Sequence, residues 1–315
     1  MQVVIHIGTE KTGSTTLQEF MVLNRDVLLV NGVYVPQCLG RSNHRKLAVY
    51  CMSDSKLDDF IINNGLIKKR KRERFRQSVA DALIKELGEL DQTLVDTVLI
   101  SSEHFHSRLT DISEVEQLKV LFASIGADVK VICYLRKQSH LVESKYSTFL
   151  KSRGMTASFA SFSEECVESN RYYNYDLFLK LWEQCFSVEN IRIREFSLNK
   201  FKENNLCLDF LGFAGLNVEE KELNFPGDKN MSLSALGMFM MRVVNRVFIA
   251  KETGNMSNKN RKRVVDFISN FFSGKKPRLM SFDEGNIIDR HFDKCNAEVS
   301  SRYNIQLFPD VKDNR

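Results

Sequence analysis

Short apolar runs alternate along this chain with longer stretches of mixed polarity. The first run, residues 2–7, is rich in β-branched residues and alternates little, which is typical of a strand buried on both faces of a parallel sheet. Similar runs at 95–100, 129–135 and 190–194 predict three more strands. Because helical patterns separate these runs, we expect an α/β fold with a central parallel sheet of about five strands flanked by helices.

The stretches between and beyond the strands show the apolar spacing of helices. Helices are expected at 13–28, 57–90, 112–125, 138–151, 176–186, 206–211, 232–251 and 260–272. The most apolar window, 233–250, carries Arg242, Asn245 and Arg246, so it predicts a core-facing helix rather than a membrane span. Its stripe of Met and Phe residues, which includes Phe239, is expected in the core rather than around a ligand.

Composition narrows the function only slightly. The chain has 315 residues, of which 43% are hydrophobic and 27% charged, as in an ordinary globular protein. A net charge of +5 is compatible with an anionic ligand but identifies none. The seven cysteines are scattered without a C-x-x-C pair, which predicts reduced thiols rather than a zinc site. The first residues lack a secretory leader pattern, so we expect a cytoplasmic protein.

A basic run occupies residues 68–74. It is typical of the solvated face of a helix, and an acidic polysaccharide ligand is the alternative. Few aromatic residues lie among these charges, so nucleic acid is not favoured as a partner.

A glycine-containing loop, residues 8–16, follows the first strand and leads into a helix. Such a loop is an anion site, because free backbone N–H groups and the helix dipole point at the ligand. Lys11 adds a positive charge, and neighbouring Ser and Thr hydroxyls add donors. Gly8 and Gly13 have the spacing of a Walker A loop, but Ser14 stands where that pattern has lysine. The alternative is a Ser/Thr-capped helix with a chance lysine.

A second candidate anion site follows the strand at 129–135. Arg136 stands where that strand ends, and Ser144 comes eight residues later, about two turns into the next helix. An arginine can bind a phosphate through two parallel hydrogen bonds, and a serine on the helix can donate another.

Together the two motifs resemble those of sulfotransferases that use 3′-phosphoadenosine 5′-phosphosulfate (PAPS) and release 3′-phosphoadenosine 5′-phosphate (PAP). The resemblance implies a P-loop NTPase-like sulfotransferase fold in which Arg136 and Ser144 hold the 3′-phosphate and no metal is needed. The 5′-phosphosulfate would be held by Lys11, Thr12, Gly13, Ser14, Thr15 and Thr16. Asn230 and Ser232, which open a predicted helix, are implied as weaker cofactor contacts. We expect one domain, residues 1–315, in which a helical part, residues 230–315, covers the acceptor cleft.

The branch of the family is suggested by softer resemblances. Many members have a proline two residues after the arginine, where this chain has Gln138. The surrounding residues instead resemble the bacterial carbohydrate branch, which implies a carbohydrate or glycoconjugate acceptor. Similar segments are Gly32-Val33-Tyr34-Val35-Pro36, Asn43-His44, Ser101-Ser102-Glu103, Asn174-Tyr175-Asp176 and Asn230-Met231-Ser232-Leu233-Ser234.

Transfer to a hydroxyl requires a cation at the leaving oxygen and a base at the acceptor. Lys11 is the candidate cation. Two residues are candidates for the base: Glu103, which follows the second strand, and His44, in the region after the first helix where related enzymes often place a base. A helix-capping carboxylate and a surface loop residue are the respective alternatives.

Two other functions are compatible with the motifs. A nucleotide-dependent kinase or NTPase with a variant phosphate loop would need a Mg²⁺-binding carboxylate, which Glu103 could supply, and a lysine where Ser14 stands. The second alternative function is that of a nucleotide-binding module without turnover. The presence of Lys11, Arg136 and Ser144 argues against it.

Overall fold

The computed structural model describes residues 1–227, 233–249, 257–272 and 279–309. The chain forms two compact units, each made of separate stretches of sequence. The first unit contains 1–136, 175–226 and 295–315, and the second contains 137–174 and 227–294. The second unit therefore draws on 137–174 as well as on C-terminal residues, while the single domain with a cleft-covering part from residue 230 stays a prediction.

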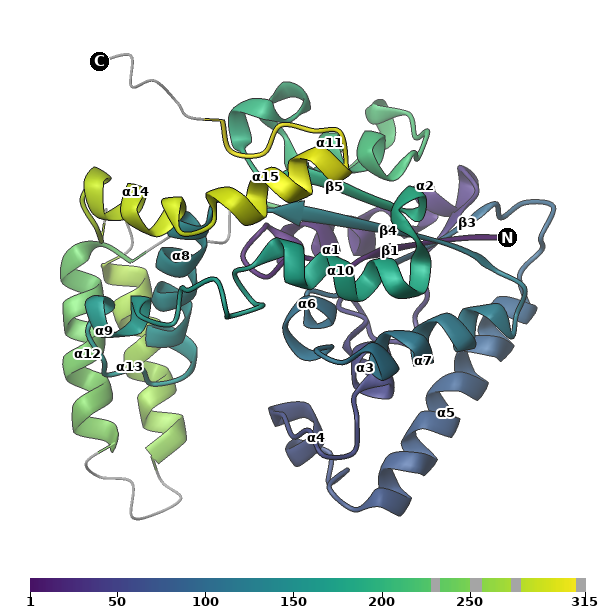
Figure 1. Cartoon of the computed structure of the whole chain (residues 1–315). Helices are drawn as coiled ribbons and strands as arrows, with labels where there is room; N and C mark the ends of the chain where they lie inside the picture. The colour runs from purple at the N-terminus through teal and green to yellow at the C-terminus, as the bar shows by residue number, and fades with distance from the viewer. Residues whose placement is uncertain (228–232, 250–256, 273–278, 310–315) are drawn as a thin grey trace. The chain divides into compact units, whose positions relative to one another are not determined.

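A five-stranded parallel sheet forms the centre of the first unit (Figure 1). The strand order is β2-β3-β1-β4-β5. The strands are β1 (Gln2–His6), β2 (Val33–Tyr34), β3 (Thr97–Ser101), β4 (Asp128–Leu135) and β5 (Ile191–Glu195). The predicted α/β class is confirmed, and four of the strands fall where the apolar runs predicted them. The two residues of β2, at the sheet edge, are too few to give a pattern.

Helices cover both faces of this sheet, as parallel strands require. One face packs on α1 (Ser14–Leu23), α2 (Arg25–Val30) and α11 (Leu206–Ala214), whose apolar residues form one buried cluster with Val4, Leu99 and Ile132. The helices α7 (Ile112–Ala123) and α10 (Tyr175–Phe186) cover the other face (Figure 1). Successive strand residues point to opposite faces, so the continuous apolar runs fill both layers of the core.

The remaining helices of the first unit lie around the sheet. They are α3 (Arg45–Cys51), α4 (Asp59–Asn63), α5 (Lys69–Gly88), α6 (His104–Arg108) and α15 (Asp293–Arg302), with 3₁₀ turns at Val188–Asn190, Leu198–Lys200, Lys202–Asn204 and Glu220–Glu222. The segment 57–90 is largely helical, as predicted, but it is divided into α4 and α5 by a turn through Gly65, whose φ is +63°. The basic run is not wholly solvated either: Arg72 is buried and donates to the carbonyls of Leu66 and Lys56.

The second unit is helical. Its helices are α8 (Gln138–Ser152), α9 (Phe159–Ser163), α12 (Ala235–Ile249), α13 (Ser257–Phe271) and α14 (Phe282–Arg290). Along α12, Met238 and Met241 are buried as expected, but Phe239 is 59% exposed, so the core assignment of the whole stripe was wrong. Within the described part of the chain, none of the helices combines the length and the apolar character that crossing a bilayer demands.

Candidate functional site

The strand order singles out the carboxyl ends of β1 and β4. The chain passes from β1 to β2 and β3 on one side of the sheet, and then crosses to β4 and β5 on the other side of β1. The adjacent strands β1 and β4 therefore form the topological switch point, where doubly wound sheets bind their ligands. The loop with Lys11 follows β1, and Arg136 directly follows β4.

The conformation of the loop explains its residues. Gly8 and Gly13 have φ values of +102° and +76°, which favour glycine, and Lys11 shares this left-handed region at +67°. A Cβ on Gly13 would also come within 2.3 Å of Leu206 Cδ2. Two hydrogen bonds hold the turn: the Thr9 N–H donates to Tyr134 O on β4 at 2.9 Å, and Thr12 Oγ1 donates to Thr9 O at 2.6 Å. The loop is therefore shaped by its own backbone and by the neighbouring strand.

Open hydrogen-bonding capacity is concentrated at the start of α1. Its N-cap residue, Gly13, supplies no side-chain cap, and the first turn of an α-helix leaves N–H groups without intrahelical partners. Ser14 is 5% exposed, and its Oγ has no hydrogen-bond partner among the described residues. A buried hydroxyl without a partner is costly unless a ligand or water completes it. Thr15 is exposed and Thr16 half-buried beside it. These donors suit a phosphate-like anion.

Arg136 reaches this same loop. Its Nη1 donates to Lys11 O at 2.7 Å, and its guanidinium lies 5.4 Å from the centre of the Phe196 ring. Tyr175 Oη donates to Arg136 O at 2.5 Å and accepts from the Arg136 N–H at 3.2 Å. The structure thus brings two of the predicted residues, Lys11 and Arg136, together and fixes the backbone of the arginine.

Glu103 also lies against the loop. A Cβ placed on Gly8 would be 3.3 Å from Glu103 Cα. The carboxylate does not cap α6; its Oε2 instead accepts hydrogen bonds from Gln18 Nε2 at 2.8 Å and Asn43 Nδ2 at 3.0 Å. Its Oε1 has no hydrogen-bond partner among the described residues. Sequence reasoning missed Gln18, although a buried polar residue on the helix after a phosphate-type loop is a usable signal.

His44 is wholly buried rather than part of an exposed loop. Its ring Nδ1 accepts a hydrogen bond from the backbone N–H of Ser101 at 3.0 Å, and the backbone N–H of His44 donates to Ser101 O at 3.0 Å. Burial lowers the pKa of His44 to about 4. His6 is a core histidine: its Nδ1 lies 2.8 Å from Ser101 Oγ, and burial lowers its pKa to about 3. Both histidines are neutral at pH 7.

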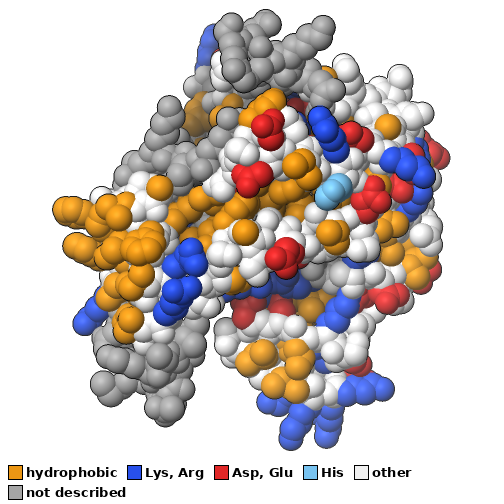
Figure 2. Space-filling view, turned by 60° about the vertical axis from the view of Figure 1, so that its left-hand side comes forward, with side chains coloured by type: hydrophobic (Ala, Val, Ile, Leu, Met, Phe, Trp, Pro, Cys, Tyr) orange, Lys and Arg blue, Asp and Glu red, His pale blue; other side chains and the backbone are white. Residues whose placement is uncertain are grey.

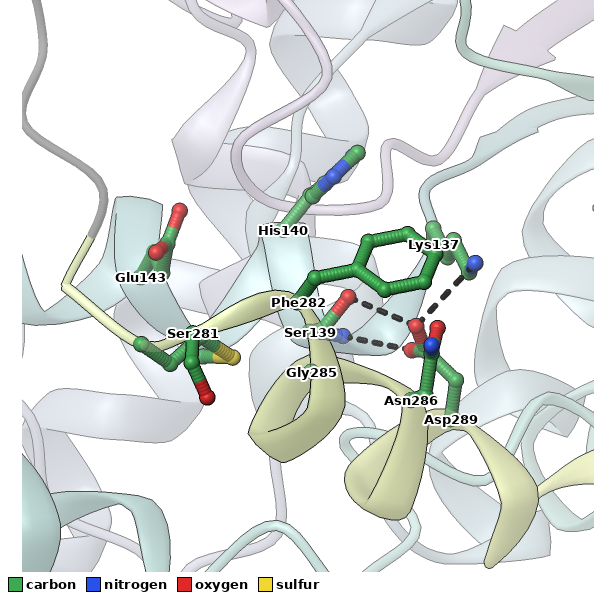
Figure 3. Close-up of a pocket in the computed structure, with 10 residues that line it drawn as sticks. Lys137, Ser139, His140, Glu143, Ser281, Phe282, Gly285, Asn286 and Asp289 are labelled. Atoms are coloured by element: carbon green, nitrogen blue, oxygen red, sulfur yellow. Dashed lines mark hydrogen bonds and ion pairs between the residues drawn. The ribbon is translucent and has the colours of Figure 1, made fainter. Parts of the chain in front are cut away.

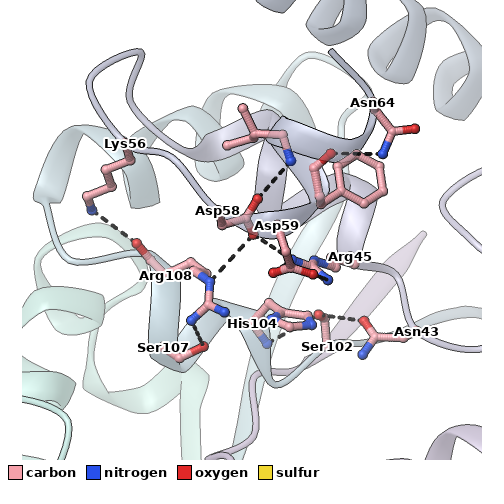
Figure 4. A network of polar contacts seen from close by, with 12 residues as sticks. Asn43, Arg45, Lys56, Asp58, Asp59, Asn64, Ser102, His104, Ser107 and Arg108 are labelled. Atoms are coloured by element: carbon pink, nitrogen blue, oxygen red, sulfur yellow. Dashed lines mark hydrogen bonds and ion pairs between the residues drawn. The ribbon is translucent and has the colours of Figure 1, made fainter. Parts of the chain in front are cut away.

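An ion-pair network lies between the loop and α4, and Figure 4 shows the part of it formed by Arg45, Asp58, Asp59 and Arg108. Arg108 lies 3.9 Å from Glu10 of the loop and 3.5 Å from Asp58. Arg45 pairs with both Asp58, at 2.7 Å, and Asp59, at 2.6 Å. The hydrogen bond from Arg45 lowers the pKa of Asp59. This network, which the sequence did not reveal, ties the segment before α4 to the loop after β1.

The second unit carries the other predicted residues. Ser144 lies on α8 and is half-buried, and its phosphate-binding role stays a prediction. The N-terminus of α8 is capped by Asp289, which accepts the N–H of Ser139 at 2.9 Å and its Oγ–H at 2.8 Å and lies 3.2 Å from Lys137 Nζ (Figure 3). These residues line a pocket with His140, Glu143, Met280, Ser281, Phe282, Gly285 and Asn286. The predicted contacts Asn230 and Ser232 lie outside the described residues.

The comparisons with known proteins give matches at 14–30% identity. No family model matches it. An uncharacterized protein of Archaeoglobus fulgidus is 30% identical over 172 residues, which are 54% of this chain and 43% of that protein, so the match spans less than half of the relative. A sulfotransferase from Alicyclobacillus acidocaldarius superposes with a TM-score of 0.45 at 15% identity, over 72% of this chain and 87% of that one. The mouse sulfotransferase SULT7A1 complexed with PAP gives a TM-score of 0.41 at 14% identity, over 95% and 85%.

Proposed function

We propose that this chain is a PAPS-dependent sulfotransferase with a P-loop NTPase-like sulfotransferase fold. One observation carries the proposal: the loop of Lys11 and the guanidinium of Arg136 meet at the switch point of the sheet, where Arg136 Nη1 donates to Lys11 O at 2.7 Å. Two sites for anions side by side suit a nucleotide with phosphate groups at two positions. The resemblance of both motifs to the family supports the same ligand.

The residues present fit a phosphosulfate at the loop. The uncapped start of α1 offers backbone N–H donors, and Ser14 Oγ is buried without a partner among the described residues. Lys11 contributes the positive charge. We assign the 3′-phosphate to Arg136, whose side chain stays positively charged at any physiological pH.

When bound, PAPS supplies a sulfuryl group joined to a phosphate that can leave. Lys11 would stabilise the charge that develops on the leaving oxygen, and such a cation acts more strongly in the transition state than in the ground state. Glu103 would take the proton of the acceptor hydroxyl, because it lies against the loop and its Oε1 has no partner among the described residues. The contacts of His44 with Ser101 favour a structural role, so we rank it below Glu103 as the base.

The acceptor follows from the resemblance alone. The segments around Gln138 and the other motif residues are similar to the bacterial carbohydrate branch, so we propose a hydroxyl of a carbohydrate or glycoconjugate. A screen that compares saccharide acceptors with small phenols tests this class of acceptor, and the release of PAP serves as its readout. Transfer to phenols alone would contradict it.

Calorimetric titration with PAP, beside ADP and ATP with and without Mg²⁺, tests the nucleotide. We expect PAP to bind without metal and more tightly than either adenosine phosphate. Arg136→Ala should weaken PAP binding roughly 10- to 100-fold, because it removes one or two charge-assisted hydrogen bonds. Arg192→Ala, which removes an exposed arginine of β5, is the matched control and should change the affinity less than twofold. Tighter binding of ATP with Mg²⁺ would reject the proposal in favour of a kinase or NTPase.

A further inference from the structure

The helices α12 and α13 of the second unit expose an unusual number of large apolar side chains. The exposed residues, which we call the apolar face, are Leu236, Phe239, Val243, Val247, Phe267 and Phe271. Their exposed fractions range from 40% for Val243 to 74% for Phe271. Single exposed apolar residues are common on soluble proteins, but six on two neighbouring helices form a patch of the kind that marks an interaction site.

The spacing shows that this face is organised. On α12, Leu236, Val243 and Val247 recur at intervals of seven and four, so they lie on one side of the helix. On α13, Phe267 and Phe271 are four apart, and their rings stack with centres 5.5 Å from each other. The two helices pack closely, since a Cβ on the buried Gly237 would come within 2.9 Å of Phe272 Cβ.

The apolar face is not needed to hold these helices together. The opposite sides of α12 and α13 are buried through Met238, Met241, Val265 and Ile268. Each helix therefore has two apolar sides, of which one is buried and the other is exposed to water. Figure 2, turned so that this side of the chain comes forward, shows hydrophobic side chains gathered together with Lys and Arg beside them.

The distribution of charged residues indicates which kind of partner binds the apolar face. Residues 235–278 contain ten Lys and Arg against two Asp and Glu, whereas the rest of the chain contains 35 against 38. The chain's positive charge is thus concentrated in this segment, and the remainder is slightly acidic. Exposed arginines continue the apolar stripes: Arg246 lies seven residues after Phe239, and Arg263 lies four residues before Phe267. Neither arginine forms an ion pair with another described residue.

We propose that the apolar face of α12 and α13 docks the protein on an anionic lipid bilayer. Helices with Phe and Leu on one side and Lys and Arg around it lie in the interface between headgroups and acyl chains. The basic residues would be attracted by the negative surface potential, and the rings would enter the interface. The helices would lie on the bilayer rather than cross it. This proposal is independent of the transfer reaction.

Other occupants fit less well. In a symmetric dimer the same patch of both copies would meet, which would bring two strongly basic segments together. Nucleic acid would match the charge, but Leu and Val side chains offer it neither stacking nor hydrogen bonds. An anionic bilayer complements both the charge and the apolar surface.

Co-sedimentation of the full chain with vesicles tests the proposal. Vesicles of phosphatidylcholine alone are compared with vesicles that contain 30% phosphatidylglycerol, at about 0.1 M and about 0.5 M salt. We expect binding to the anionic vesicles, weakened by salt, and little to the neutral ones. Neutralising Arg246, Lys262 and Arg263 to Gln should lower the partition coefficient on the order of 100-fold, since each charge near an anionic surface contributes about fivefold.

The apolar contribution has its own variant and control. Phe267→Ser with Phe271→Ser should lower the partition coefficient about tenfold, because two rings no longer enter the interface. Leu94→Ser with Val120→Ser removes two residues of the first unit that are 67% and 66% exposed, and it should leave binding unchanged. Equal binding to neutral vesicles, or no binding to either kind, would overturn the proposal. So would a dimer, seen by light scattering, that the Phe variants dissociate without loss of vesicle binding.

Discussion

At the carboxyl edge of the sheet, Ser14 Oγ is buried without a described partner, and the N-cap residue of α1 supplies no side-chain cap. The hydrogen bonds that Glu103 accepts from described residues go to its Oε2. In the interior of the helical unit, Asn245 and Lys145 are buried polar side chains with partners, whereas Arg242 Nε is buried without a partner among the described residues. Asn245 donates to the carbonyls of Leu150 and Met155, both at 2.9 Å, and accepts from Arg261. Lys145 pairs with Glu165 at 2.7 Å. Buried polar groups normally find partners inside the protein. Ser14 therefore differs from Asn245 and Lys145 in offering a buried polar atom to a ligand, a feature it shares with atoms outside the loop such as His6 Nε2 and Trp182 Nε1.

Aromatic rings reinforce this difference in the helical unit. The ammonium of Lys145 lies 4.0 Å from the centre of the Tyr172 ring and 5.0 Å from that of Tyr173, and Tyr173 Oη also accepts from it at 3.2 Å. A lysine surrounded in this way links α8 to the segment before α10. Its neighbour in sequence, Ser144, is only half-buried.

The largest expected effect is on catalysis at the sheet edge. Glu103→Gln should slow PAPS-dependent transfer by about 10²- to 10⁴-fold, because it removes the base. Binding of PAP should change less than threefold, since the amide keeps an acceptor oxygen for Gln18 and Asn43. The rate is measured as PAP released in the presence of saccharide acceptors.

His44→Gln is the comparison variant for this prediction. It is expected to lower the stability of the fold, because the Ser101 N–H loses its partner, while the rate per folded molecule stays close to that of the unaltered chain. A larger loss of rate in His44→Gln than in Glu103→Gln would move the base to His44.

An intermediate effect is expected in the helical unit. Asn245→Ala removes two donated hydrogen bonds and two accepted from Arg261 at a fully buried position. We expect the free energy of unfolding, measured in urea, to fall by about 3 kcal/mol. Asn63→Ala, at an exposed position of α4, should change it by less than about 0.5 kcal/mol. An unchanged stability in Asn245→Ala would show that the paired interior does not hold the helices.

The sequence predicted the sheet better than it predicted the helices around it. Apolar runs such as 129–135 mark strands buried on both faces, and those runs have few other interpretations. The break between α4 and α5 was missed because Gly65 stands alone in a helical pattern, where it is usually tolerated. The exposure of Phe239 was missed because periodicity shows that a stripe exists, and not whether a neighbour covers it.

The site shows the same limit. The loop of Lys11 and the position of Arg136 followed from local patterns and from the rule that ligands bind at strand ends. The sequence could not show that Gln18 and Asn43 hold Glu103, or that His44 is buried against Ser101, because these contacts join residues 57 to 85 positions apart. Such pairings depend on how the elements pack, which no single segment specifies.

The smallest expected effects concern two hydroxyl groups of the same loop, and their comparison is the most direct test. Ser14→Ala should leave the free energy of unfolding unchanged or slightly raised, because it removes a buried hydroxyl without a described partner, and it should weaken PAP binding about fivefold. Thr12→Val should instead lower the free energy of unfolding by about 1 kcal/mol, because it deprives Thr9 O of a donor at 2.6 Å. Urea unfolding and calorimetry measure both quantities. If Ser14→Ala lowered stability without affecting the nucleotide, its open hydroxyl would belong to the fold, and the distinction between the two regions would fail at its most sensitive point.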